Sequence, residues 1–331
     1  MTEQTEPAER SPELSIVIPC FNEADNVAAI CAAVTAEAER HADGHEIILI
    51  DNHSTDGTRA IMRELCDGDT RIRAIFNNRN YGQMRSPTYG LYQAEGRAVI
   101  GMCADFQDPP QMIGAFLGRW RAGAEVVLGQ RRSERASWPL RAARHIGYGI
   151  LRRFGDYPII PGATGFGLFD SKVLDTLAAW NEPEPFFRGM VVEGGFHLAV
   201  IPFERPVRAA GVSKNDFSAL ASFALSGLAG SAKSLLRLPV FLSAYAMLVA
   251  LGLAVAGAAA LALGGPAWVL LGLALIAALF GILMLFMGLI GEQLRLLSER
   301  GRNVPLVIEE ERINFPADRR KPAIRTFVQR P

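Results

Sequence analysis

The feature that most constrains this chain is a run of 54 consecutive residues, 238–291, without a single Asp, Glu, Lys, Arg or His. A helix needs about 20 apolar residues to cross a bilayer, so this run is long enough for two spans. A Gly-Gly-Pro sequence at 264–266 predicts a turn between helices at 238–263 and 267–291. We therefore expect a membrane protein with two transmembrane helices.

Basic residues lie on the outer sides of both predicted spans and are absent from the turn between them. They are Lys233, Arg237, Arg295, Arg300 and Arg302. The positive-inside rule then places both ends of the chain in the cytosol, as in a multi-pass protein of the inner (cytoplasmic) membrane. Residues 213–237 mix Ser, Phe and Leu with basic residues and predict juxtamembrane amphipathic helices. Residues 292–331 follow as a cytosolic C-terminal tail.

The part before the membrane region alternates between strand-like and helix-like segments after a polar lead-in at residues 1–13, which we expect to be disordered. Buried strands are predicted at 14–19, 46–51, 71–77, 97–102, 125–129 and 197–204, helices at 26–40, 57–66 and 84–95, and a Pro/Gly-rich loop at 157–167. This pattern predicts an α/β domain over residues 14–212 with a Rossmann-like, mostly parallel sheet. Ligands of such sheets bind at the carboxyl ends of the strands.

Two acidic residues fall at predicted strand ends, Asp51 and Asp105. Converging carboxylates there suit a divalent cation and a nucleotide, because Mg²⁺ usually takes one or two carboxylates together with substrate phosphates. Asp is also common in turns and helix caps, so a purely structural role stays open for each residue. The 34 basic and 34 acidic residues balance, which disfavours a nucleic-acid partner.

The four cysteines form no CxxC pair and have no His at metal-finger spacing. They are typical of reduced cytosolic thiols. With no His nearby in sequence to activate it, Cys103 is not expected to act as a nucleophile.

Four segments, IPCFNEADNV, IILIDNHSTDGT, NRNYGQ and ADFQDPP, resemble in order and spacing the family 2 glycosyltransferases. The later FFRG, RAAGVSK, LLRLP and ERINF segments are similar to the polyprenyl-phosphate branch of that family, which includes dolichol-phosphate mannose synthase and bacterial undecaprenyl-phosphate sugar transferases. The resemblance implies a GT-A domain, a nucleotide-sugar donor, a Mg²⁺ or Mn²⁺ ion, a polyprenyl-phosphate acceptor in the membrane and a homo-oligomer.

The resemblance also implies roles for individual residues. The nucleotide sugar would be bound by Pro19, Phe21, Glu23, Asp51, Asn52, Asn80, Gly82 and Arg131. Asp105 and Gln107 would hold the cation and the donor diphosphate. Asp105 would act in catalysis together with Arg208, Ser213 and Lys214, which lie on a loop that closes over the acceptor phosphate. Basic groups and a cation suit this chemistry because the leaving diphosphate and the attacking phosphate are both anionic.

The chain departs from the family pattern at three places. Cys103-Ala104-Asp105 stands where the family usually has Asp-Ala-Asp, and a thiol is a poor ligand for Mg²⁺. Gly165 stands where the family usually has an Asp that is proposed to assist catalysis. In the second motif, Asn52 replaces the usual second Asp and His53 the common Gly. A lipid phosphate already carries an anionic oxygen, so it can attack without a strong base.

Two functions of different classes remain at this point. One is an inverting transferase that moves a sugar from a nucleotide donor to undecaprenyl or a similar polyprenyl phosphate. The other is a catalytically silent, glycosyltransferase-like membrane protein that binds lipid or a partner. A processive polysaccharide synthase is disfavoured because the chain lacks a QxxRW segment and further spans.

Overall fold

The computed structural model describes residues 11–132, 160, 162–204, 206 and 305–316, together with separate helical positions between 272 and 301. The predicted catalytic residues Arg208, Ser213 and Lys214 lie outside the described residues. So do the lead-in up to residue 10, the juxtamembrane segment 213–237 and the first predicted span, 238–263.

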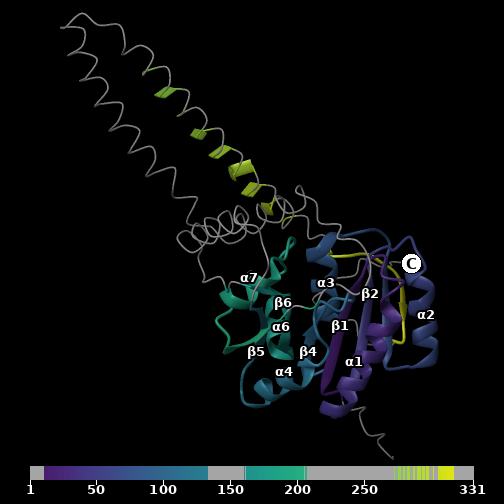
Figure 1. Cartoon of the computed structure of the whole chain (residues 1–331). Helices are drawn as coiled ribbons and strands as arrows, with labels where there is room; N and C mark the ends of the chain where they lie inside the picture. Colours follow the sequence, from purple (N-terminus) through teal and green to yellow (C-terminus); the bar gives the residue numbers. More distant parts are fainter. Residues whose placement is uncertain are drawn as a thin grey trace, which may run out of the picture.

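A single sheet of eight strands organises the described part of the chain (Figure 1). The strands are β1 (Leu14–Cys20), β2 (His45–Asp51), β3 (Ile72–Asn77), β4 (Ala98–Gly101), β5 (Val126–Arg131), β6 (Ala163–Asp170), β7 (Leu198–Phe203) and β8 (Glu309–Ile313). Their order in the sheet is β7-β5-β6-β4-β1-β2-β3-β8. The predicted strands correspond to β1 to β5 and β7, so the α/β expectation is confirmed for this part of the chain.

The sheet is more mixed than predicted. The four strands β3, β2, β1 and β4 are parallel, and β5 is parallel to β7. The strand β6, however, is antiparallel to both of its neighbours, and β8 is antiparallel to β3. Much of β6 falls in the Pro/Gly-rich segment predicted to be a loop, and β8 falls in the predicted tail. Glycines and charged residues weaken the usual strand signal in these two segments.

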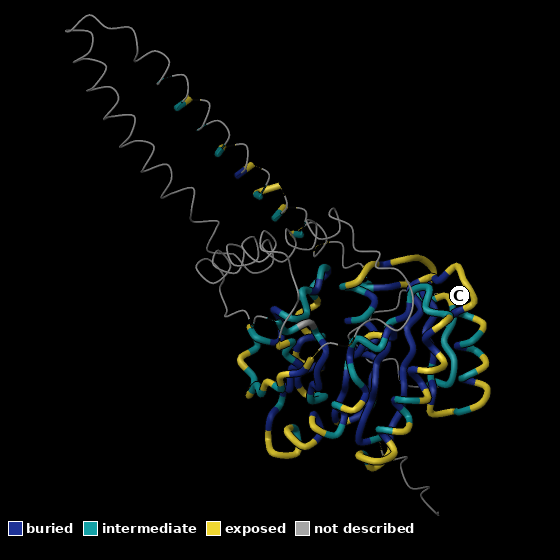
Figure 2. Tube along the Cα trace, in the orientation of Figure 1, coloured by how far each residue is buried: buried dark blue, intermediate teal, exposed yellow. Residues whose placement is uncertain are grey.

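Helices cover both faces of the sheet. They are α1 (Val27–His41), α2 (Thr58–Gly68), α3 (Gly82–Gln93), α4 (Met112–Arg121), α6 (Ser171–Ala179) and α7 (Phe187–Glu193). Alternate residues of a strand point to opposite faces. Thus Ile16 and Ile18 pack with α1, α2 and α4, whereas Val17 packs with α3, α6 and α7. The strands therefore form the dark-blue buried centre of Figure 2, and the loops at their ends are largely exposed.

The last strand, β8, comes from beyond the apolar run and completes the sheet at the edge of β3 (yellow strand near α2 in Figure 1). Asn314, just after β8, donates from Nδ2 to the carbonyl oxygens of Cys66 (2.8 Å) and Ile72 (2.9 Å). These bonds fix the end of β8 to both α2 and β3. A segment more than 200 residues from β3 in sequence is thereby part of the same domain.

Beyond β7, the described helical positions between 272 and 301 carry an exposed apolar surface. Its large side chains, each about half exposed or more, are Ile276, Leu283, Met287, Ile290, Leu294 and Leu297. Among the residues that the structure describes, no helix is both long and apolar enough to span a bilayer.

The close pairing of β5 with β6 depends on Gly167. A Cβ atom at this position would lie 2.4 Å from the carbonyl oxygen of Val127, which is backbone and cannot give way. We expect Gly167→Ala to destabilise the domain by about 1–3 kcal/mol, as overpacked cores usually are. Gly118→Ala in α4, where nothing lies within 4 Å, is the matched control and should be neutral or slightly stabilising. Thermal unfolding of both variants distinguishes them; equal melting temperatures would contradict the prediction.

Candidate active site

The carboxyl end of β2 carries a fully buried carboxylate. Asp51 has no exposed surface, and it accepts hydrogen bonds from the backbone N–H groups of His53 (3.1 Å) and Ser54 (3.1 and 3.2 Å). It also forms an ion pair with Arg59 of α2, with 3.2 Å between Nε and Oδ2. A buried carboxylate is costly unless it is paired and hydrogen-bonded, and here both conditions are met. Asp51 therefore fixes the turn that leaves β2.

That turn is joined to the loop after β1 by bonds between side chains and backbone. The Ser54 hydroxyl accepts from the N–H of Asn22 (2.8 Å), and the Asn22 side chain accepts from the N–H of Thr55 (2.8 Å). Thr58 Oγ1 accepts from the N–H of Glu23 (2.8 Å). Asn22 and His53 both have positive φ, 56° and 66°. The two loops thus form one rigid surface at the ends of β1 and β2.

A third loop, between β3 and α3, is attached through Asn52. Its Nδ2 donates to Asn80 Oδ1 (2.8 Å) and to the Gly82 carbonyl oxygen (3.3 Å), and its Oδ1 accepts from the N–H of Tyr81 (2.8 Å). The side chain of Asn52 is therefore used by the protein itself. Asn80 Oδ1 also accepts from the N–H of Gly82 (2.7 Å), so Asn52 orders a loop whose Asn80 and Gly82 are exposed but already bonded to each other.

The acidic segment follows β4 at the same edge of the sheet. Asp105 is 9% exposed, and its Oδ1 accepts from the N–H of Gln107 (3.2 Å). The buried Asp108 accepts from the N–H of Cys103 (2.9 Å), and so closes the loop on itself. Burial raises the pKa of Asp108, aided by the nearby charge of Asp105 and opposed by the bond from Cys103 and by the Arg131 guanidinium. Asp105 and Arg131 therefore both lie close enough to Asp108 to affect its carboxyl group.

A divalent cation at this edge would need ligands from these same loops. In the described part of the chain, no three His, Cys, Asp or Glu side chains are grouped so that they could hold a metal ion. An all-protein metal site is therefore not formed by these residues. Mg²⁺ does not need one, because it is commonly held by one or two carboxylates, substrate phosphates and water. Asp105 and Gln107 fit a cation of that kind, which would bind together with the donor.

The beginning of β6 lies beside the end of β4, where Gly101 pairs with Gly167. Gly165 is at this edge, and the carbonyl oxygen of Gly165 would lie 3.7 Å from a Cβ atom placed on Gly101. The φ angle of Gly165 is 95°, a conformation that side chains of L residues rarely adopt. Gly165 therefore both lacks the carboxylate that is usual in the family and has a backbone conformation that suits glycine.

The structure places all ten residues predicted for the nucleotide sugar and the cation at one edge of the sheet. Pro19, Phe21, Glu23, Asp51, Asn52, Asn80, Gly82, Asp105, Gln107 and Arg131 all lie at or just beyond the carboxyl ends of β1 to β5. Among the first seven of these, Asp51 and Asn52 are buried, whereas Pro19, Phe21 and Glu23 are partly exposed and Asn80 and Gly82 are exposed. Asp51 and Asn52 therefore hold the loops from within and do not present their side chains at the surface.

Several structural residues of the site were not predicted from the sequence. They are Asn22, Ser54, Thr55, Thr58, Arg59 and Asp108. A signal existed for five of them, because short runs of Asn, Asp, Ser and Thr at a strand end commonly bond to neighbouring backbone. Nothing in the local pattern marks Arg59, whose partners come from the preceding strand β2 and from the distant strand β8.

Comparison with known proteins identifies the family. Residues 15–177 match the family model described as glycosyl transferase family 2. The domain formed by residues 15–177 belongs to this family. It is therefore a glycosyltransferase, and the matched residues cover most of the mixed α/β sheet, from β1 to β6.

Individual relatives extend beyond the matched domain. An uncharacterized glycosyltransferase of Synechocystis sp. is 28% identical over 89% of this chain and 94% of its own length. The bactoprenol glucosyl transferase of Shigella phage SfV is 28% identical over 65% of this chain and 71% of its own. Among solved structures, a mannosyltransferase of Pyrobaculum calidifontis in complex with GDP-Man and Mn²⁺ aligns with a TM-score of 0.45 and 19% identity, over 89% of this chain and 88% of that one.

The four thiols of the transferase should differ sharply in reactivity. Cys20, Cys31 and Cys66 are buried, and burial raises the pKa of Cys20 strongly and that of Cys31 and Cys66 to about 12. Because the thiolate is the reactive form, these three should resist alkylation at neutral pH. Cys103 is exposed and should be the main site of maleimide modification in the native protein, as measured by peptide mass spectrometry. Full labelling of a native Cys103→Ser variant would contradict this expectation.

The backbone at His53 should be more stable with glycine. An L residue at a φ of 66° is strained, and this explains why the family commonly has Gly here. We expect His53→Gly to raise the free energy of unfolding by roughly 0.5–1 kcal/mol. Asn22→Gly is the control, because the same relief of strain is offset by loss of the bond from Thr55. Thermal unfolding that shows equal gains, or a loss for His53→Gly, would refute the interpretation.

Proposed function

We propose that the protein transfers one sugar from a nucleotide-sugar donor to undecaprenyl phosphate or a similar polyprenyl phosphate, with inversion. One oxygen of the lipid phosphate forms a bond to the anomeric carbon while the bond from that carbon to the nucleoside diphosphate breaks. The nucleoside diphosphate leaves with the bonding electron pair. The reaction takes place at the cytosolic face of the inner membrane.

The observation that carries the donor half is the meeting of four loops at one edge of the sheet. The loops after β1, β2 and β3 are bonded to one another through Asn22, Ser54 and Asn52, and they leave exposed groups at their surface. The acidic loop after β4 follows at the same edge, as the parallel pairing of β1 with β4 requires. This arrangement suits a ligand with a base and ribose at one end and a diphosphate at the other.

The cation is proposed to bind between the donor diphosphate and Asp105, with Gln107 beside it. When bound, Mg²⁺ or Mn²⁺ would neutralise charge that develops on the leaving diphosphate. Arg131, at the end of β5, adds a permanent positive charge on this side of the site. Asp108 supports the same loop from within rather than reaching the ligand, because it is 3% exposed and its Oδ2 accepts from the N–H of Cys103.

The proposal of a lipid-phosphate acceptor is supported by similar proteins and by the apolar surface of this chain. The similar bactoprenol glucosyl transferases of Shigella phages are named for transfer to a polyprenyl lipid. The charge-free run 238–291 and the exposed apolar helix positions from Ile276 to Leu297 suit contact with lipid. We propose two membrane spans in this region, and Arg208, Ser213 and Lys214 as the groups that meet the acceptor phosphate. A homo-oligomer is part of the same proposal.

A catalytically silent relative is the second candidate function. It is favoured by Cys103 in place of a carboxylate and by Gly165, whose backbone conformation disfavours the usual Asp. It is opposed by the retained Asp105 and Gln107 and by the ordered donor loops. Turnover separates the two candidates, because a silent relative would bind nucleotide without releasing a sugar lipid.

The test is a transfer assay with the purified full chain, undecaprenyl phosphate, Mg²⁺ and a panel of UDP- and GDP-sugars. We expect a sugar lipid with one donor of the panel. Asp105→Asn should lower its rate of formation by two or more orders of magnitude, since the cation loses its anionic protein ligand. Asp67→Asn, at an exposed position of α2, is the control and should leave the rate unchanged. Near wild-type turnover of Asp105→Asn would remove Asp105 from the metal role, and nucleotide binding without any transfer would favour the silent relative.

A further inference from the structure

We propose that Arg59 is a positioning residue for donor binding, and that Glu310 of β8 holds Arg59 in place. The strand β8, which follows the apolar run in the sequence, would then contribute to donor binding. This inference rests on the proposed function, because it assumes that a nucleotide binds on the loops after β1 and β2.

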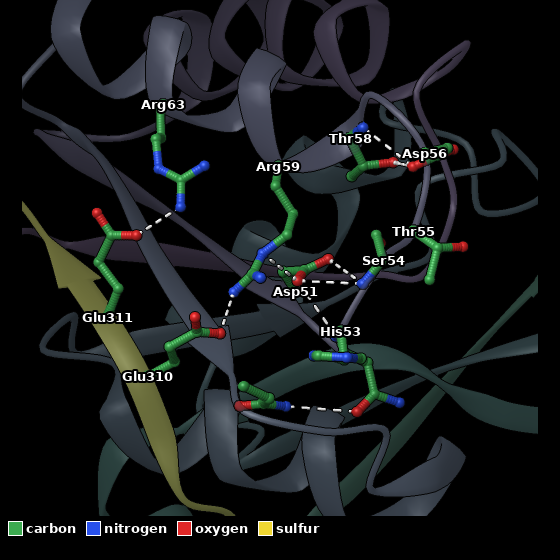
Figure 3. Close-up of polar contacts among 12 residues, drawn as sticks. Asp51, His53, Ser54, Thr55, Asp56, Thr58, Arg59, Arg63, Glu310 and Glu311 are labelled. Carbon is green, nitrogen blue, oxygen red and sulfur yellow. Dashed lines mark hydrogen bonds and ion pairs between the residues drawn. The ribbon is translucent and has the colours of Figure 1, made fainter.

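Arg59 connects two strands that do not touch each other. It extends from the first turn of α2, and its Nε lies 3.2 Å from Asp51 Oδ2 at the end of β2. Its Nη2 lies 2.7 Å from Glu310 Oε2 on β8. Figure 3 shows the guanidinium between the two carboxylates, with the buried one on the side of the donor loops. Only about one fifth of the Arg59 side chain is exposed, so the charge is well placed to act on Asp51.

The position of Asp51 in turn determines the donor loops. Asp51 holds the N–H groups of His53 and Ser54, and Ser54 holds the N–H of Asn22. The next residues along that loop include Glu23, whose N–H is held by Thr58 from the start of α2. A shift of Arg59 would therefore move both the turn after β2 and the loop after β1. No other positively charged group is paired with Asp51 among the described ion pairs.

The segment before β8 supports the third donor loop independently. The N–H of Ile308 donates to Tyr81 Oη (3.2 Å), and the N–H of Asn78 donates to the Ile308 carbonyl oxygen (3.1 Å). Arg85 donates to the Pro305 carbonyl oxygen (3.0 Å). Tyr81 is the residue whose N–H binds Asn52, so these contacts reach the same surface from its other side. Residues 305–310 thus contact the loop after β3 directly through Ile308, and they contact Arg59, the partner of Asp51, through Glu310.

The chain itself contains a matched control. Arg63, one turn further along α2, pairs with Glu311, the next residue of β8, at 2.6 Å between Nη2 and Oε2. Both arginines lie over the ring of Phe76, with guanidinium carbons 5.1 Å (Arg59) and 4.6 Å (Arg63) from its centre. Glu310 and Glu311 are similarly exposed, 53% and 40%. The two pairs differ in one respect that matters here: among the described ion pairs, Arg59 also pairs with Asp51, whereas Arg63 does not.

The experiment reverses the charge of each glutamate in the full-length protein. Glu310→Lys repels Arg59, and Glu311→Lys repels Arg63, while both keep β8 and its backbone pairing. We measure binding of UDP and of GDP with Mg²⁺ by calorimetry, and then KM and kcat with the productive donor. We expect Glu310→Lys to weaken binding of the preferred nucleotide at least fivefold and to raise KM with kcat changed less than twofold. Glu311→Lys should change the dissociation constant less than twofold.

The milder pair Glu310→Gln and Glu311→Gln repeats the comparison without a repulsive charge, in case a lysine prevents folding. We expect Glu310→Gln to weaken nucleotide binding about threefold and Glu311→Gln to leave it unchanged. Equal effects at positions 310 and 311, or no effect at either, would overturn the positioning role while leaving the proposed function intact. A wild-type protein that binds neither nucleotide would overturn the proposed function and this inference with it.

Discussion

A buried carboxylate at the end of β2 is the interaction on which the candidate site depends. Asp51 has no exposed surface, so its charge must be balanced by the protein. Two backbone N–H groups and the Arg59 guanidinium supply that balance. Loss of any of these partners would leave a buried charge unbalanced, which is costly. The partners are therefore held in place by the carboxylate that they stabilise. The turn after β2, with its strained residue His53, is stable for this reason.

The sequence predicted what depends on local pattern and on motifs. Aliphatic runs such as 14–19 and 46–51 became central parallel strands, and the motif residues Asp51, Asn80 and Asp105 came together at one edge of the sheet. Local pattern failed where glycine or charge dominates, as in β6 and in β8, whose sequence is EEERI. It also failed for Arg59, since its second ion pair is with a residue of a strand about 250 residues away. Such a contact leaves no periodicity to detect.

The acidic loop after β4 is built differently from the loops after β1, β2 and β3. Those three loops are bonded to one another by side chains, whereas in the loop after β4 Asp108 accepts from the N–H of Cys103 in the same loop. Cys103 is exposed and Gly165 has no side chain, so this part of the site offers fewer fixed ligands than the family pattern would. A cation bound here would depend more on phosphate oxygens of its ligand than on the protein. Ion and donor would then bind together rather than in turn.

The position of β8 in the chain also bears on biosynthesis. A ribosome completes β1 to β7 first, then the apolar run, and only then residues 309–313. Until that moment the edge of β3 has no partner on its outer side, Arg59 lacks one of its two carboxylates, and an open strand edge is a hazard for wrong pairing. The domain can therefore reach its final form only after the apolar run has left the ribosome. A nascent chain would therefore be unable to bind the donor fully until residues 238–291 and β8 have been synthesised.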